Sequence, residues 1–135
     1  MVRLAKLILV VAALIPVSAA GQICVEQIRV PKYPALAWAA QWTGAVDLTV
    51  TIGTEGQVIR VEGSGSFPYL VEQAKANVKE WVFCAPGKNE GTHVQLRYDY
   101  RLEGARVYPP PTAKVIVDLG DATVLIRMPP PEPQS

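Results

Sequence analysis

The chain has few of the residues that catalytic and metal sites use most. His93 is its only histidine, and Cys24 and Cys84 are its only cysteines. Its carboxylates are scattered singly, and Thr92 and Asp99 beside His93 have no spacing typical of a nucleophile and its base. A zinc site made from both cysteines and His93 would have three ligands and no known spacing. The sequence therefore predicts a non-enzyme with no metal, no cofactor and no evident small-molecule substrate.

An excess of charge of one sign is also absent. The 13 basic and 12 acidic residues leave a formal net charge of +1. Proteins that bind nucleic acids usually present a strongly basic face. The balance does not favour a nucleic-acid partner, and a length of 135 residues indicates one domain.

No hydrophobic run is long enough to be a typical membrane span, which needs about 20 residues. Residues 7–17 form an apolar run after Arg3 and Lys6, interrupted by Pro16 and followed by small residues. This order is typical of an export signal. We predict a cleaved signal peptide over residues 1–20; an uncleaved leader that anchors the chain in the inner membrane is the alternative.

Export to an oxidising compartment favours pairing of the two cysteines. A Cys24–Cys84 disulfide would join the N-terminus of the mature chain to the exit of its main helix. Two unpaired thiols are the alternative.

The main helix is predicted within residues 67–86. Its apolar residues recur at helical spacings of four, four and three: Leu70, Ala74, Val78 and Trp81. Ser66 is the predicted N-cap, Pro68 suits the first turn, and Pro86 prevents continuation. A shorter helix is predicted over residues 35–41, after Tyr33 and Pro34.

Three segments alternate between apolar and polar residues, as half-buried strands do: residues 45–52, 58–62 and 93–102. The turn at residues 53–56 joins the first two as a hairpin, with Ile59 and Val61 on the core side. In the third, the predicted core side holds Val94, Leu96, Tyr98, Tyr100 and Leu102. The other side holds His93, Gln95, Arg97, Asp99 and Arg101.

The last third of the chain is rich in proline. Pro109–Pro111 form a stiff linker, and Val115–Leu119 and Thr123–Met128 could form a hairpin. Residues 129–133 are predicted to be an extended, disordered tail. We therefore divide the chain into a signal peptide (1–20), a domain (21–104) and a Pro-rich region (105–135).

In their order, several markers resemble the C-terminal domain of TonB-family energy transducers over residues 30–103. These are Tyr33-Pro34, Gly44, Gly56, Ser64-Gly65, Leu70, Ala74, Trp81-Val82-Phe83, Pro86, Tyr98 and Tyr100. The resemblance implies an α+β fold: a three-stranded antiparallel sheet in the order β-β-α-β, with a short N-terminal helix, packed on helices. The C-terminal hairpin or strand would be an addition. Predicted structural core residues are Tyr33, Pro34, Trp81, Phe83, Tyr98 and Tyr100.

The resemblance also implies a periplasmic protein-interaction module in TonB-dependent transport. Such a domain binds an extended peptide of an outer-membrane receptor, or another envelope protein, as an added strand beside residues 93–102. The implied partner-binding residues are His93, Gln95, Arg97, Asp99 and Arg101; a solvated face with no partner is the alternative. Residues 20–32 reach only about 45 Å when extended, so the resemblance supports binding better than force transmission.

Two further expectations concern the same edge. Val115–Leu119 is predicted to fold back and pair with residues 93–102, because proteins usually cover a long exposed edge. The rival function is a structural or dimerising envelope protein that uses this edge to pair with a second copy.

Overall fold

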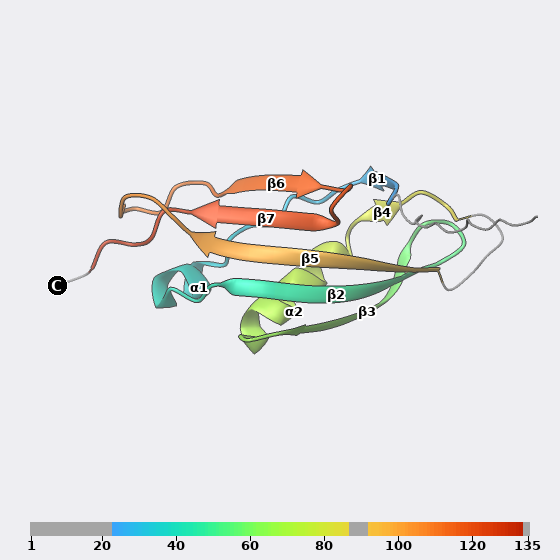
Figure 1. Cartoon of the computed structure of the whole chain (residues 1–135), viewed down its shortest axis with the longest axis horizontal. Helices are drawn as coiled ribbons and strands as arrows, with labels where there is room; N and C mark the ends of the chain where they lie inside the picture. The colour runs from blue at the N-terminus through green and yellow to red at the C-terminus, as the bar shows by residue number, and fades with distance from the viewer. Residues whose placement is uncertain (1–22, 87–91, 134–135) are drawn as a thin grey trace, which may run out of the picture.

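The computed structural model describes residues 23–86 and 92–133, and the predicted signal peptide lies outside them. The elements, in chain order, are β1 (Val25–Gln27), α1 (Ala35–Ala40), β2 (Gly44–Ile52), β3 (Val58–Gly65), α2 (Pro68–Val78), β4 (Val82–Phe83), β5 (Thr92–Leu102), β6 (Lys114–Asp118) and β7 (Thr123–Met128). Figure 1 shows one long sheet with α2 behind it and α1 at one end.

The large sheet has the strand order β3-β2-β5-β7-β6. All its pairs are antiparallel except β5 and β7, which run parallel. Strands β2, β3 and β5, with α2 between β3 and β5 in the chain, form the predicted three-stranded antiparallel unit. The C-terminal hairpin extends this unit to five strands.

Helix α2 supplies one layer of the core. Leu70, Val71, Ala74 and Val78 are buried, and the helix packs against β2 and β3. Its N-cap is Phe67, with no side-chain cap, so the prediction of Ser66 was wrong. Ser66 lies one residue too early because Pro68 already fixes the first helical position.

The aromatic residues expected in the core form its centre. Trp81, Phe83, Tyr98 and Tyr100 are each 0–1% exposed, and Tyr33 packs edge-on against Tyr100 at 5.5 Å. Pro34 is buried as well. The rings thus fill the space between the sheet and the segment that leads into α1.

The β2–β3 hairpin contains an irregularity that moves one side chain. Thr51 pairs with Arg60 but Ile52 pairs with Val58, so Ile59 is an extra residue in β3. An extra residue shifts the inside–outside alternation. Ile59 is consequently 56% exposed, contrary to its predicted place in the core, whereas Val61 is buried as predicted.

The two cysteines are joined in a disulfide, with their Cα atoms 5.3 Å apart. Strands β1 and β4 pair beside it, and the amide of Cys84 donates to the carbonyl oxygen of Cys24 at 2.9 Å. The chain before α1 is therefore fixed to the segment that follows α2, at the upper right of Figure 1.

The C-terminal hairpin differs from the prediction in one respect. β7, not Val115–Leu119, pairs with β5, and β6 lies outside β7. A central strand must bury one side fully, and Val124 and Ile126 of β7 are 0% exposed. β6 is short and has a charge at each end, Lys114 and Asp118, which suits an edge strand.

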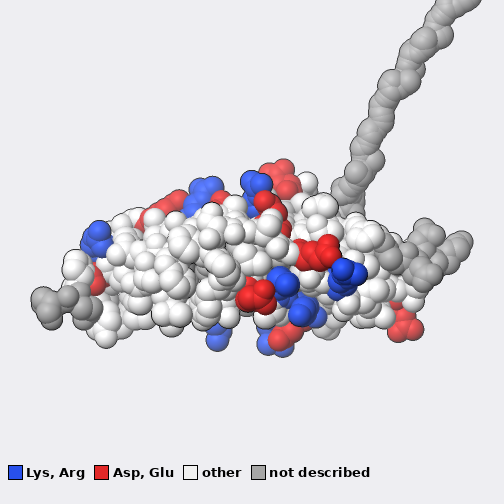
Figure 2. Space-filling view, turned by 90° about the horizontal axis from the view of Figure 1, so that it is seen from below, with Lys and Arg blue, Asp and Glu red and all other residues white. Residues whose placement is uncertain are grey.

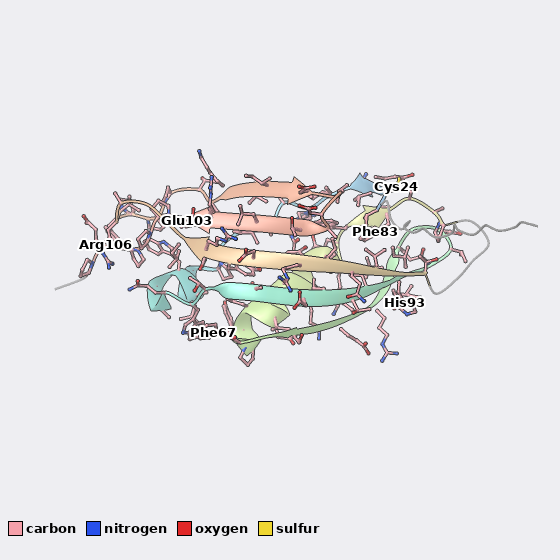
Figure 3. The ribbon with its side chains drawn as sticks, in the orientation of Figure 1. Cys24, Phe67, Phe83, His93, Glu103 and Arg106 are labelled. Atoms are coloured by element: carbon pink, nitrogen blue, oxygen red, sulfur yellow. A yellow bond between two sulfur atoms is a disulfide. The ribbon has the colours of Figure 1, made fainter. Side chains whose placement is uncertain are left out.

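The segment after β7 also makes specific contacts where a disordered tail was predicted. The indole nitrogen of Trp38 donates to the oxygen of Pro129, and Arg106 donates to that of Pro131. The amide of Val107 donates to the oxygen of Pro130 at 3.0 Å. Arg106 and Glu103 lie at the end of the sheet where β5 and β7 stop, far from Cys24 and Phe83 (Figure 3).

Candidate functional site

The candidate site is strand β5, which lies between β2 and β7. Its pairing with β2 covers Thr92–Tyr100, and its pairing with β7 covers Arg97–Leu102. Among the described strands, none pairs with His93–Leu96 on the β7 side. The predicted binding edge is therefore divided into a half that β7 covers and a shorter half that it leaves uncovered.

Two hydrogen bonds to β7 and the turn before it show which main-chain groups of β5 face this edge. The amides of Arg97 and Glu103 donate to the oxygens of Ala122 and Met128, at 2.9 and 2.8 Å. Main-chain groups in a strand alternate between its two sides. The odd-numbered residues of β5 thus face β7, and in the uncovered half these include His93 and Gln95.

The side chains predicted to contact a partner lie on the solvent face of the sheet. His93, Gln95, Arg97 and Arg101 are exposed and Asp99 is half-buried. The opposite side of β5 packs into the core through Leu96, Tyr98 and Tyr100. The alternation thus brings the five predicted residues to one face, although the neighbouring edge is partly covered.

Most of the charges on this face are paired. Arg97 contacts Asp47 at 2.8 Å, and Arg101 contacts Asp99 at 2.9 Å. Glu103 lies 3.6 Å from Arg101 and 3.5 Å from Arg127 of β7. Such exposed pairs each contribute little to stability, but they neutralise the surface that a partner would meet.

The same pairs affect the two guanidinium groups. The hydrogen bond and the charge of Asp47 raise the pKa of Arg97. The hydrogen bond and the charge of Asp99 raise the pKa of Arg101, with a smaller effect of Glu103. Both arginines therefore stay charged, so the face does not change its charge through them at physiological pH.

Sequence reasoning missed the contacts that hold β7 in place. Glu103 and Arg127 connect the end of β5 to β7, and Trp38 reaches the residue after β7. The alternation of Val124, Ile126 and Met128 with Leu125 and Arg127 was the available signal for a strand with one buried side.

His93 lies in a shallow hollow on the sheet. The hollow is also lined by Thr51, Ile59, Arg60 and Glu62, and Glu62 is paired with Arg60 at 2.8 Å. Within the described residues, no group of three or more histidines, cysteines or carboxylates could hold a metal ion.

The surface seen in Figure 2 carries acidic and basic side chains interspersed, with an uncharged stretch beside them. No patch of one sign dominates that view.

A family model described as the Gram-negative bacterial TonB protein C-terminal domain matches residues 29–103. The chain belongs to this family. The match runs from the segment before α1 to the end of β5, so β6 and β7 lie beyond it. No curated protein matches the chain.

Membership in the TonB C-terminal family indicates a periplasmic module that interacts with other proteins, in general those of the outer membrane. In the described part of the chain, no helix is both long and apolar enough to span a membrane.

Proposed function

We propose that this TonB-type domain binds an extended peptide of an outer-membrane receptor by strand addition along β5, as part of TonB-dependent transport. One observation carries the proposal: β5 already accepts a strand, β7, on the edge where the family resemblance puts the peptide. That edge therefore offers main-chain hydrogen-bonding groups to an added strand. It also lets the apolar side chains of such a strand pack into the core, as Val124 and Ile126 of β7 do.

β7 also indicates which peptide would fit. It runs parallel to β5, with Val124, Ile126 and Met128 toward the core and Leu125 and Arg127 toward solvent. A matching peptide would have about six residues with apolar side chains at alternate positions. The segment that precedes β6 is long enough to let the hairpin move away, since it spans residues 103–113.

In this proposal β7 competes with the receptor peptide. The apparent affinity is reduced by the fraction of molecules in which β7 has left the edge. Burial of Val124 and Ile126 keeps that fraction small. A receptor peptide present at high local concentration would displace β7.

A reversible cross-link tests the proposal. Asp99 and Leu125 are register partners on the solvent face, and adjacent strands lie about 4.8 Å apart, within the range of a disulfide. The double variant Asp99→Cys/Leu125→Cys should hold β7 in place. Fluorescent extended peptides from outer-membrane receptors, and a peptide with the sequence of residues 123–128, serve as probes.

The wild-type chain should bind the probes, the oxidised variant should not, and reduction of the variant should restore binding. The reductant would also break the native Cys24–Cys84 disulfide. The wild type is therefore measured under the same reductant as a control. Equal binding by the oxidised variant and wild type, or no binding by wild type, would contradict the proposal.

A second pair of variants changes how often β7 leaves. Ile126→Ala weakens the packing of β7 by about 2–5 kcal/mol and should tighten probe binding. Leu70→Ala in α2, at a site that is equally buried, is the matched control and should not tighten it. Tighter binding in both variants would point to general loosening of the fold.

A further inference from the structure

Strand β6 forms one outer edge of the sheet, and no described strand pairs with its outer side (Figure 1). It is the uppermost strand of the large sheet in that view. Val115, Ile116 and Val117 make it rich in β-branched residues, which favour strand pairing. An edge of this kind can recruit another strand unless something opposes it.

The main-chain direction of β6 follows from that of β7. Because Ala122 and Met128 direct their oxygens to β5, the even-numbered residues of β7 face β5 and the odd-numbered ones face β6. Leu125 of β7 is paired with Ile116 of β6. Even-numbered residues of β6 therefore bond to β7, and Val115 and Val117 direct their amides and carbonyls outward.

The side-chain sequence of β6 is complementary to itself when reversed. It reads Lys-Val-Ile-Val-Asp over residues 114–118. When two copies run antiparallel and are centred on Ile116, Lys114 of each lies opposite Asp118 of the other. Val115 of each copy then lies opposite Val117 of the other. These are the two residues of β6 whose main-chain groups point outward.

We propose that β6 pairs with β6 of a second copy of this chain in this register. The two sheets then join into one across a two-fold axis, with roughly four main-chain hydrogen bonds at the join. A shift by two residues would keep the outward groups paired but would place Lys114 opposite Ile116. The charges therefore select the centred register.

Among the residues that the structure describes, neither Lys114 nor Asp118 of β6 has an ion-pair partner. Lys114 is paired in register with Arg127, and like charges at opposite positions repel. Asp118 accepts a hydrogen bond from the amide of Asp121 at 3.1 Å with one oxygen. A second copy would bring a carboxylate to Lys114 and a cation to Asp118.

The apolar side chain between these charges also gains cover. Ile116 is 51% exposed on the solvent face, next to Leu125. In the centred register it meets Ile116 of the second copy at a non-hydrogen-bonded position, where side chains lie closest. The result is a continuous apolar row from Leu125 of one copy to Leu125 of the other.

The other outer edge, β3, differs from β6 because its charges are already compensated within one copy. Its Arg60 and Glu62 are already paired with each other, and Gly63 and Gly65 contribute no side chains to a cross-strand contact. β3 therefore serves as an internal control for edge pairing.

A charge exchange tests the proposal on the full chain purified from the cell envelope. A five-residue edge makes a small interface, so the wild type should dimerise weakly. In sedimentation experiments, the fraction of dimer should therefore rise with protein concentration. Lys114→Asp or Asp118→Lys alone places like charges opposite each other and should weaken dimerisation by about tenfold. The double variant should restore it.

The matched controls are Arg60→Asp and Glu62→Lys on β3, which should leave dimerisation unchanged. The proposal is overturned when the wild type stays monomeric up to about 1 mM, a range that detects even weak pairs. It is also overturned when the double variant associates no better than the single ones.

Cross-linking provides a second readout for weak association. Ile116→Cys should form an intermolecular disulfide, because Cα atoms at such a position lie about 4.5 Å apart. Ile59→Cys on β3 is similarly exposed, 56% against 51%, and should cross-link far more slowly. Equal rates would indicate random collision and contradict pairing through β6.

Discussion

The indole nitrogen of Trp38 donates a hydrogen bond to the main-chain oxygen of Pro129 at 2.7 Å, joining residues 91 positions apart in the sequence. Trp38 belongs to α1, which lies within the family match, and Pro129 follows β7, which lies outside it. This contact therefore connects the part of the chain that matches the family to its C-terminal addition, at the point where β7 ends.

Removal of this bond should loosen β7 selectively. Trp38→Phe keeps a ring in the core but leaves the oxygen of Pro129 without its donor, at a cost of about 1 kcal/mol. Amide hydrogen exchange over β7 should then become roughly fivefold faster. Mass spectrometry of peptides from residues 123–131 measures this change.

The control for this change is Trp42→Phe. Trp42 stacks on Phe67 at a centroid distance of 5.5 Å, at the start of α2. Its replacement should leave exchange in β7 unchanged. Faster exchange in β7 with both variants would show that the Trp38 contact has no specific role.

The disulfide should contribute a large part of the stability. Cys24 and Cys84 are 60 positions apart, and closing a loop of that size stabilises a fold by about 4 kcal/mol in the chain-entropy model. Reduction should therefore lower the midpoint of urea unfolding strongly. In the Cys24→Ser/Cys84→Ser variant, reductant should have no effect; a midpoint in wild type that is insensitive to reductant would contradict the prediction.

The sequence pattern predicted the parts of the fold that depend on local periodicity. The alternation in residues 93–102 placed Tyr98 and Tyr100 inside and Arg97 and Asp99 outside, as the structure has them. The positions of β2 and α2 followed from the same rules. Each of these elements has one buried side, so the spacing of its apolar residues shows both the type of element and the side that faces the core.

The order of strands in the sheet could not be read in this way. Both β6 and β7 have strand-like sequences, and local pattern alone does not say which one meets β5. The answer depends on burial across the whole sheet, where Val124 and Ile126 fill the core. Ile59 shows the same limit on a smaller scale, because the extra residue in β3 is visible only in the pairing with β2.

Asn77 should be a sensitive position at the end of α2. Its side-chain oxygen accepts from the hydroxyl of Tyr98 at 2.6 Å and from the indole of Trp81 at 3.0 Å, and its amide donates to the oxygen of Arg29. Asn77→Ala removes the acceptor of the buried Tyr98 hydroxyl and one of the two acceptors of the Trp81 indole, which also donates to the oxygen of Arg29 at 3.1 Å. The expected loss is about 1–3 kcal/mol in the free energy of unfolding, measured in urea.

Gln73 lies four residues earlier on the same helix and is exposed. Gln73→Ala is the matched control and should change stability by less than about 0.5 kcal/mol. A similar loss in both variants would show that the hydrogen bonds of Asn77 are not the cause.

Three buried tyrosines should make the fold sensitive to alkali. Burial raises the pKa of Tyr33 from 10.0 to about 12, and burial also raises the pKa of Tyr98 and of Tyr100. Above pH 10 the unfolded chain loses these protons while the folded chain keeps them. The stabilisation is thus complete below about pH 10 and declines as the pH rises toward the folded-state values.

Each such tyrosine should lower the free energy of unfolding by up to about 1.4 kcal/mol per pH unit in that range. Tyr33→Phe removes one titrating group, and the curve should become shallower between pH 10 and about 12, where Tyr33 itself titrates in the fold. Tyr108 is 62% exposed, so Tyr108→Phe is the matched control and its curve should follow that of wild type. Urea unfolding at a series of pH values measures the slopes, and an unchanged slope in Tyr33→Phe would contradict the assignment.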